Sequence, residues 1–361
     1  MNAWALILHP QAHEAIEHYR LALASGALQA GSRLAKALSA TSVADLTTEA
    51  FIDALLATKP PQIFAESAVY GDGRDWTATE LSLLGDINIA VDVTVFDDGR
   101  HSHPGIHPTP FPACLLFTPG ALLRNDRGGI PADWQAVTKA NQIDAAGYRA
   151  LYERRLLPLF HFASEQAGRQ GKQAFVTIPG LGCGQFAGPF IGQMGKHLQA
   201  AIHAILEQHA AALPHLKAVW FDPYQECANE SHQLGHITYR VRPLTQGNQD
   251  KPQLCSPSHY QEAGDDFSQC RLYSLVAWDH VSWPGNDFYG GARATDDGVK
   301  AAATDSMRAM TGIAGAYDPK RYAYQPPKPF STWGQLVADK HITLASGDRL
   351  RILPAPGGHG N

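Results

Sequence analysis

Residues 175–188 read Phe-Val-Thr-Ile-Pro-Gly-Leu-Gly-Cys-Gly-Gln-Phe-Ala-Gly. The run 175–178 is short, apolar and rich in residues that favour β-structure, so it predicts a buried strand. The glycines that follow let the backbone adopt positive φ and approach a ligand closely. A helical pattern starts soon after, at residue 190. A strand, a glycine loop and a helix in this order can present backbone N–H groups to phosphate. The alternative is a tight turn that binds nothing.

Composition and charge narrow the class of protein. The chain has 361 residues, of which 44% are hydrophobic and 17% charged, an ordinary globular balance. A formal net charge of -5 argues against nucleic acid as a partner. The five cysteines are odd in number and include no Cys-x-x-Cys pair, which indicates a reducing compartment. We find no run of about 18 apolar residues, so we expect a soluble protein without a membrane partner.

Strand and helix patterns alternate along the chain, which predicts an α/β fold with a mixed, mostly parallel sheet. In such sheets, ligands bind at the carboxyl ends of the strands, where the 175–188 loop begins. The predicted strands are 81–96, 113–117, 175–178, 216–221, 237–241 and 273–278. The predicted helices lie within 11–40, 48–57, 143–168, 190–212 and 298–310, and residues 245–269 form a polar insertion. We expect a helical N-terminal extension over 1–60, a main domain over 61–315 and a C-terminal extension or tail over 316–361.

The order of these pieces resembles that of a macrodomain, the α/β module that binds ADP-ribose. That pattern begins with Gly-Asp-Ile at a strand, here residues 85–87. It continues with a strand that leads into a glycine-ended loop, here residues 114–130. A helix, a strand and a second glycine loop follow, and this loop is the 175–188 stretch. The resemblance covers roughly residues 80–300. It implies a three-layer fold that binds ADP-ribose and needs no cofactor.

The resemblance also implies contacts with ADP-ribose. Asp86 would contact adenine, the second glycine loop would wrap the diphosphate, and Phe186 would lie against the distal ribose. The ligand-binding residues expected in this way are Asp86, Ile87, Thr118, Gly128, Gly129, Gly180, Gly182, Cys183, Gly184, Gln185, Phe186, Ala187 and Tyr289.

One departure from the macrodomain pattern bears on activity. Hydrolytic macrodomains usually carry asparagines at the end of the first strand, beside the distal ribose. This chain has Phe117-Thr118-Pro119-Gly120 there. Proline and glycine supply no side-chain hydrogen bonds, so we expect either a protein that only binds ADP-ribose or one whose catalytic groups lie elsewhere.

A second candidate site lies in residues 275–298, where aspartates alternate with aromatic residues and glycines. Asp279 ends the last predicted strand, Asp287 lies in a glycine-rich loop, and Asp297 precedes a predicted helix. Carboxylates crowded together in a low dielectric acquire separated pKa values, which suits one acid and one base. The alternative is structural, because aspartates also form turns and cap helices.

The segment is similar to that of the MavL-type bacterial effector ADP-ribosylhydrolases, which remove ADP-ribose from an arginine of ubiquitin. The acidic residues of that group are eight and ten positions apart, as are Asp279, Asp287 and Asp297. The resemblance implies a catalytic trio that cleaves an N-glycosidic bond through an oxocarbenium-like state. We assign the attacking water to Asp297 or Asp287 and the departing guanidinium to Asp279.

Three functions therefore stay open. The first is an ADP-ribosylhydrolase acting on a protein arginine, with ubiquitin as the substrate that the resemblance suggests. The second is an ADP-ribose reader without chemistry, and the third is a glycohydrolase for poly-ADP-ribose or O-linked ADP-ribose. The reducing compartment that the cysteines indicate would be the cytoplasm or, if the protein is a secreted effector, the host cytosol. No metal is expected, since the seventeen histidines include no His-Glu-x-x-His pair.

Overall fold

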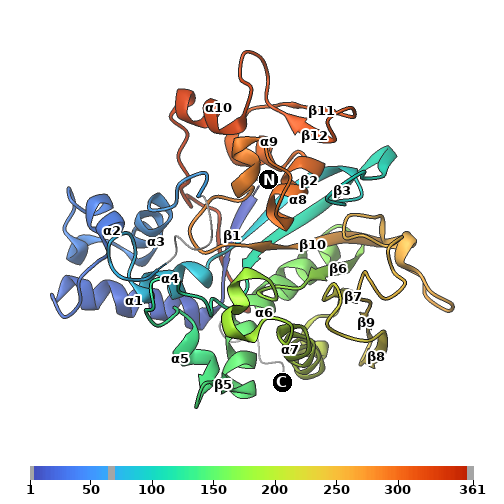
Figure 1. Ribbon diagram of the computed structural model, residues 1–361, viewed down its shortest axis with the longest axis horizontal. Coiled ribbons are helices and arrows are strands. Elements are labelled where there is room, and N and C mark those ends of the chain that lie inside the picture. Colours follow the sequence, from blue (N-terminus) through green and yellow to red (C-terminus); the bar gives the residue numbers. More distant parts are fainter. Residues whose placement is uncertain (1–3, 64–69, 356–361) are drawn as a thin grey trace.

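The structure is a computed structural model that describes residues 4–63 and 70–355. A nine-stranded sheet in the order β13-β1-β2-β3-β10-β6-β7-β9-β8 runs through it (Figure 1). The five strands from β3 to β9 in that order run parallel, and the strands β1, β2 and β8 each pair antiparallel with a neighbour. The strands are β1 (Trp4–Leu8), β2 (Asn88–Asp97), β3 (Ile106–Pro119), β6 (Gln173–Pro179), β7 (Leu216–Asp222), β8 (Glu230–Leu234), β9 (Ile237–Val241), β10 (Cys270–Trp278) and β13 (Leu350–Ile352). The predicted mixed, mostly parallel α/β sheet is confirmed.

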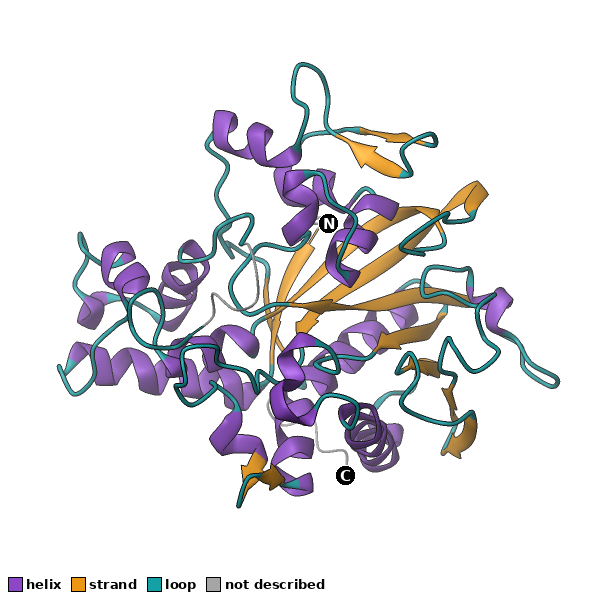
Figure 2. Cartoon of the chain, viewed as in Figure 1, coloured by secondary structure: helices purple, strands orange, loops and turns teal. Residues whose placement is uncertain are grey.

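Helices cover both faces of the sheet (Figure 2). Side chains alternate between the faces along each strand. In β3, Leu115 and Phe117 join one hydrophobic cluster, whereas Cys114 and Leu116 join the other. The first cluster packs against α1 (Pro10–Ala24), α3 (Thr48–Ala57), α4 (Ala78–Gly85), α8 (Asp296–Ala303), α9 (Ser306–Thr311) and α10 (Trp333–Lys340). The second packs against α6 (Ala145–Arg169) and α7 (Met194–His209). The result is the three-layer arrangement that was expected.

The remaining elements are short. They are the helices α2 (Ser32–Ala37) and α5 (Trp134–Val137), the 3₁₀ turns Val43–Asp45, Gln185–Phe190, Ala210–Ala212, Pro257–Tyr260 and Asn286–Gly290, and the hairpins β4 (Thr138–Lys139) with β5 (Gln142–Ile143) and β11 (Ala316–Asp318) with β12 (Ala323–Gln325). None of the helices in the described part of the chain is long and apolar enough to span a membrane.

One local prediction was wrong, and two others gain detail from the structure. Residues 81–85 belong to helix α4 and not to a strand, because Thr77 and Glu80 form a capping box that starts a helix there. Residues 298–310 form two helices, α8 and α9, separated by a break at Thr304–Asp305. The 245–269 insertion contains a 3₁₀ turn and is tied to the sheet, since Thr177 Oγ1 donates to the Gln253 carbonyl oxygen over 3.1 Å.

The two ends of the described chain meet in the same sheet. Strand β1 pairs antiparallel with β2, and β13 pairs parallel with β1. Residues 1–60 and 316–361 therefore each contribute a strand to the main sheet, in addition to the helices α1–α3 and α10. The division of the chain at residues 61 and 315 stays a prediction.

Candidate functional site

The glycine loop follows β6 and packs directly against the loop that follows β3. A side chain at Gly120 would meet the Gly182 backbone nitrogen at 2.1 Å, so only glycine permits this approach. The Leu123 N–H donates to the Phe186 carbonyl oxygen over 2.8 Å. These two loops, 120–124 and 180–188, stand together at the carboxyl ends of β3 and β6, the parallel strands on either side of β10. Ligands bind at such strand ends in α/β sheets.

A buried ion network supports the 120–124 loop from below. The Arg155 guanidinium is fully buried and pairs with Asp86 and Asp133, each over 3.0 Å. It also donates to the Gly120 carbonyl oxygen over 2.9 Å, and Asp133 accepts the Leu122 N–H over 2.8 Å. Burial opposes ionisation of Asp133, but Arg155 and His280 outweigh it and hold the Asp133 pKa below its usual range. The network therefore holds the 120–124 loop through the charged side chains of Arg155 and Asp133.

The three predicted catalytic aspartates converge after β10. The Asp297 carboxylate accepts the N–H groups of Gly285 and Asn286 over 2.7 and 2.9 Å. Asp279 accepts two N–H groups two and three positions ahead of it, over 2.7 and 2.6 Å. Asp287 accepts N–H groups at positions 294 and 295 over 2.9 and 3.1 Å. The carboxylates thus hold the shape of the 279–297 loop, as the structural alternative supposed, and they also lie near one another.

The charges within this cluster interact. Burial raises the pKa of Asp297 well above its usual value, and the carboxylates of Asp279 and Asp287 raise it further. Asp297 exposes 3% of its surface, whereas Asp287 is partly exposed. The cluster therefore combines a buried carboxyl of raised pKa with a partly exposed one, and acid–base catalysis uses such differences of environment.

A segment near the start of the chain clamps this acidic loop. The Lys59 ammonium donates to the His280 carbonyl oxygen over 2.7 Å, and the Trp283 indole donates to the Lys59 carbonyl oxygen over 2.9 Å. The Ile63 N–H donates to Asn286 Oδ1 over 2.8 Å. Burial lowers the pKa of Lys59 to about 7, although Asp279 opposes the shift. Nothing in the sequence indicates this pairing, because the partners are far apart in the chain.

The predicted ligand-binding residues fall into two groups. Asp86, Ile87, Thr118 and Tyr289 are buried, with 3%, 0%, 0% and 0% of their surfaces exposed. Both oxygens of Asp86 are engaged, one by Arg155 and the other by Arg154, over 3.0 Å each. The exposed or partly exposed group comprises Gly128, Gly129, Gly180, Gly182, Cys183, Gly184 and Gln185, whereas Phe186 and Ala187 are buried beneath their loop. The ligand roles of all these residues stay predictions.

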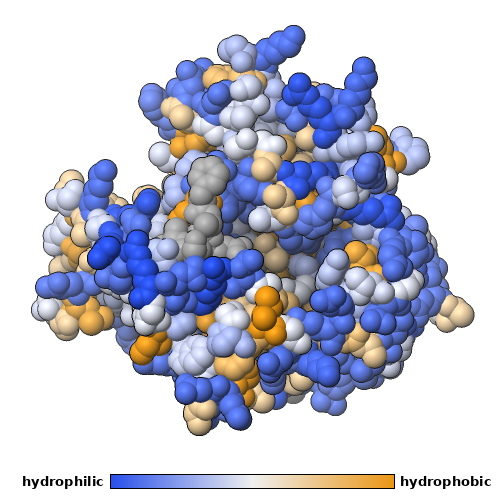
Figure 3. Space-filling model, viewed as in Figure 1, coloured by the Kyte–Doolittle hydropathy of each residue, from blue (hydrophilic) through white to orange (hydrophobic). Residues whose placement is uncertain are grey.

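A cavity of about 750 Å³ opens beside the glycine loop. Gly180, Cys183 and Gly184 form one side of it. Asp222 at the end of β7 and residues that follow it, including Tyr224, form another. Figure 3 shows the surface in the same view as Figure 1, with a hollow near the middle of this face. Within the described residues, no group of three or more His, Cys, Asp or Glu side chains is arranged to hold a metal ion.

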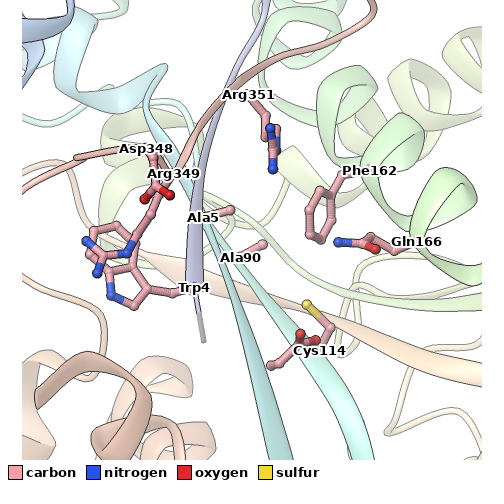
Figure 4. Close-up of a pocket in the computed structure, with 10 residues that line it drawn as sticks. Trp4, Ala5, Ala90, Cys114, Phe162, Gln166, Asp348, Arg349 and Arg351 are labelled. Atoms are coloured by element: carbon pink, nitrogen blue, oxygen red, sulfur yellow. The ribbon is translucent and has the colours of Figure 1, made fainter. Parts of the chain in front are cut away.

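A smaller cavity, of about 280 Å³, lies where β1 meets β13 (Figure 4). Trp4, Arg349 and Cys114 are among its lining residues. Cys114 pairs with Tyr273, near the amino end of β10. This cavity therefore lies toward the opposite end of the parallel strands from the glycine loop, away from the acidic cluster.

Comparison with models of protein families identifies the family of this chain. A family model described as the macrodomain effector MavL matches residues 4–330, which is most of the chain. The chain belongs to the MavL macrodomain effector family. No curated protein matched the sequence in a separate comparison.

Membership of the MavL family indicates the general function of the site. The match includes both glycine loops, the acidic cluster, and the segment from Lys59 to Ile63 that contacts the acidic loop. The macrodomain fold that was predicted is therefore confirmed, and with it an ADP-ribose-related function. The match also begins at Trp4, so the family pattern includes strand β1 and the N-terminal helices.

Proposed function

We propose that this member of the MavL family is an ADP-ribosylhydrolase that cleaves the N-glycosidic bond between ADP-ribose and a protein arginine. The observation that carries the proposal is the Asp297 carboxyl, buried beside Asp279 and Asp287 with its pKa well above the usual value. A carboxyl of raised pKa holds its proton to higher pH than an ordinary one and can protonate a leaving group. We name ubiquitin as the substrate to be tested first, on the resemblance alone.

The proposed reaction adds water across the bond. Asp287 accepts a proton from the water as its oxygen bonds to the anomeric carbon of the distal ribose. The bond from that carbon to the guanidine nitrogen breaks, and Asp297 gives its proton to this nitrogen. Asp279 binds the departing guanidinium, because carboxylates pair well with the guanidinium fork. The products are ADP-ribose and unmodified arginine, and proton exchange with solvent restores both carboxyl groups.

The glycine loops bind but do not react in this proposal. The 180–188 loop holds the diphosphate through its backbone N–H groups, and Phe186 supports the distal ribose. The Arg155 network keeps the adjoining 120–124 loop in register with it. Binding and chemistry are thus assigned to different parts of the chain, which makes them separable by mutation.

The test uses the single variants Asp279→Asn, Asp287→Asn and Asp297→Asn with an ADP-ribosyl-arginine protein as substrate. We expect each variant to lose hydrolysis by at least about 100-fold while calorimetry still detects ADP-ribose binding. Asp339→Asn, at an exposed position on α10, is the matched control and should keep full activity. Full activity in all three variants would refute the mechanism.

A reader of ADP-ribose is the second candidate function. It is favoured by the backbone hydrogen bonds that all three carboxylates accept, since these give the aspartates a structural role without any chemistry. Tight ADP-ribose binding with no hydrolysis of arginine-linked ADP-ribose by the wild type would support it. Side-by-side assays on arginine-linked, serine-linked and polymeric ADP-ribose separate the first function from a glycohydrolase of the third kind.

A further inference from the structure

The His280 side chain lies between the glycine loop and the acidic loop. His280 directly follows Asp279, and none of its surface is exposed. The centre of its ring stands 5.4 Å from the centre of the Phe186 ring, which belongs to the glycine loop. One buried imidazole therefore contacts the residue that the proposed function sets against the distal ribose, and it stands next to an aspartate of the proposed catalytic cluster.

The same imidazole reaches the ion network that supports the 120–124 loop. His280 Nε2 lies 3.5 Å from Asp133 Oδ2, and Asp133 accepts the Leu122 N–H of that loop over 2.8 Å. Burial lowers the pKa of His280, although the Asp133 carboxylate opposes the shift, so the ring is uncharged at neutral pH. His280 thus packs as a neutral ring against Phe186 of one loop and against the support of the other.

Helix α4 ends at Gly85, and this glycine leaves room for the ring. A side chain at Gly85 would meet His280 Cδ2 at 2.5 Å and Arg155 Nη2 at 2.6 Å. Because heavy atoms do not pack so closely, a larger residue at position 85 would displace His280, Arg155 or both. The glycine of the Gly-Asp-Ile sequence at residues 85–87 therefore permits the position of His280.

The backbone beside the ring is fixed by hydrogen bonds. The Lys59 ammonium donates to the His280 carbonyl oxygen over 2.7 Å. The Asp279 carboxylate accepts the N–H groups of Val281 and Ser282 over 2.7 and 2.6 Å. A buried ring on a fixed backbone has little freedom to move alone, because protein interiors are closely packed. The place of the His280 ring and the place of the Asp279 carboxylate are therefore linked.

We propose that His280 is a positioning residue, which holds the Phe186 side of the ADP-ribose site in register with the Asp279 carboxylate. The proposal rests on the proposed function for the place of the distal ribose and for the role of Asp279. It adds that the glycine loop and the acidic loop are coupled through one residue that solvent does not reach. An error of about 1 Å in such a register can cost about 100-fold in rate.

The experiment is a double-mutant cycle of Phe186→Leu and His280→Asn with two readouts. The first is kcat on an ADP-ribosyl-arginine protein, and the second is hydrogen exchange of the acidic-loop amides in the free protein. We expect each single variant to lower kcat about tenfold and to speed the exchange at least about twofold. The double variant should be no worse than the worse single variant, because both substitutions break the same contact. The ADP-ribose affinity of His280→Asn, measured by calorimetry, should stay within about threefold of the wild type.

His215→Asn is the matched control. His215 also packs against a glycine, Gly168, but it lies just before the amino end of β7. This control should leave kcat and the exchange of the acidic loop unchanged, and it should not alter the effect of Phe186→Leu when the two are combined. His280→Gln, with a longer side chain, replaces His280→Asn in the cycle if the asparagine variant does not fold.

Unchanged kcat and unchanged exchange in His280→Asn would overturn the proposal, and so would additive losses in the double variant. A loss of ADP-ribose affinity as large as the loss of kcat would also overturn it, because His280 would then act on binding alone. If the wild type hydrolyses no arginine-linked ADP-ribose, the proposed function fails and the exchange cycle alone decides. Non-additive changes in exchange would then support the coupling of the two loops, and additive or absent changes would refute it.

Discussion

Lys59 and His280 lie 221 positions apart, yet the Lys59 ammonium donates a hydrogen bond of 2.7 Å to the His280 carbonyl oxygen. The same ammonium stands 4.1 Å from the centre of the Trp278 ring. A lysine from the end of an N-terminal helix thus fixes the backbone between the last parallel strand and the acidic loop. The segment that follows the N-terminal helices therefore supports the acidic loop.

The stability of the Lys59→Met variant, compared with that of the wild type at several pH values, should reveal the titration of the buried Lys59 side chain. The pKa of Lys59 is lowered to about 7 in the folded protein, against 10.5 for the ordinary side chain. Between these values the unfolded chain binds one proton more, so Lys59 favours the folded state increasingly as pH rises. We expect the difference in free energy of unfolding, wild type minus variant, to increase by about 1.4 kcal/mol per pH unit. This increase should extend from about pH 7 to about pH 10.

Urea unfolding at several pH values in this range measures the effect. Lys340→Met, at an exposed position on α10, is the control and should shift the free energy of unfolding equally at every pH. A constant difference between the wild type and Lys59→Met would contradict the assignment of a buried, titrating ammonium.

Arg154 and Arg155 offer a matched pair, because both contact Asp86 but only Arg155 is fully buried. Arg155→Met leaves the buried Asp133 carboxylate without its main counter-charge, which costs about 3–5 kcal/mol. Arg154→Met removes a partly exposed partner and should cost about 1 kcal/mol or less. Chemical unfolding of the two variants checks the ranking, and equal losses would show that the network is not held by Arg155.

Two glycines of the same loop should respond differently to alanine. A side chain at Gly188 would meet the Leu123 carbonyl oxygen at 2.3 Å, and its φ is 53°. A side chain at Gly184 would meet nothing within 4 Å. We expect Gly188→Ala to lose about 1–3 kcal/mol of stability, while Gly184→Ala loses little. Thermal unfolding compares them, and a tolerated Gly188→Ala would argue against close packing of the two loops.

The raised pKa of Asp297 predicts the alkaline side of the activity profile. As pH rises through that pKa, Asp297 loses the proton that the proposed reaction needs, so kcat should fall about tenfold per pH unit. The ADP-ribose affinity, measured over the same range, should stay level and so separate chemistry from binding. A kcat that keeps rising into alkaline solution would remove Asp297 from the role of acid.

Local sequence patterns predicted most of the central fold. The strand at 175–178 and the helix over 143–168 correspond to features that local periodicity encodes. The capping residues Thr77 and Glu80 also signalled helix α4, although the apolar run at 81–85 suggested a strand. Strand β8 was not predicted because it is an edge strand of mostly polar, exposed residues.

The residues that support the candidate site could not be predicted from local sequence patterns. Arg155 lies within a long amphipathic helix, and its sequence neighbours do not show that it points at Asp86 and Asp133. Lys59 precedes two prolines, a pattern typical of a helix end and not of a buried charge. Both residues act through partners that only the three-dimensional fold brings near, so single-sequence reasoning has no local signal for them.

The pairing of β13 with β1 also determines the order in which strands can pair during synthesis of the chain. Strand β1 can pair with β2 once residue 97 has left the ribosome, but its other edge stays open until residue 352 emerges. At ordinary rates of synthesis this interval lasts about 10–50 s. During it the chain presents an unpaired strand edge to its surroundings, a recognised hazard for aggregation. Successful expression of this protein therefore depends on what shields that edge before translation ends.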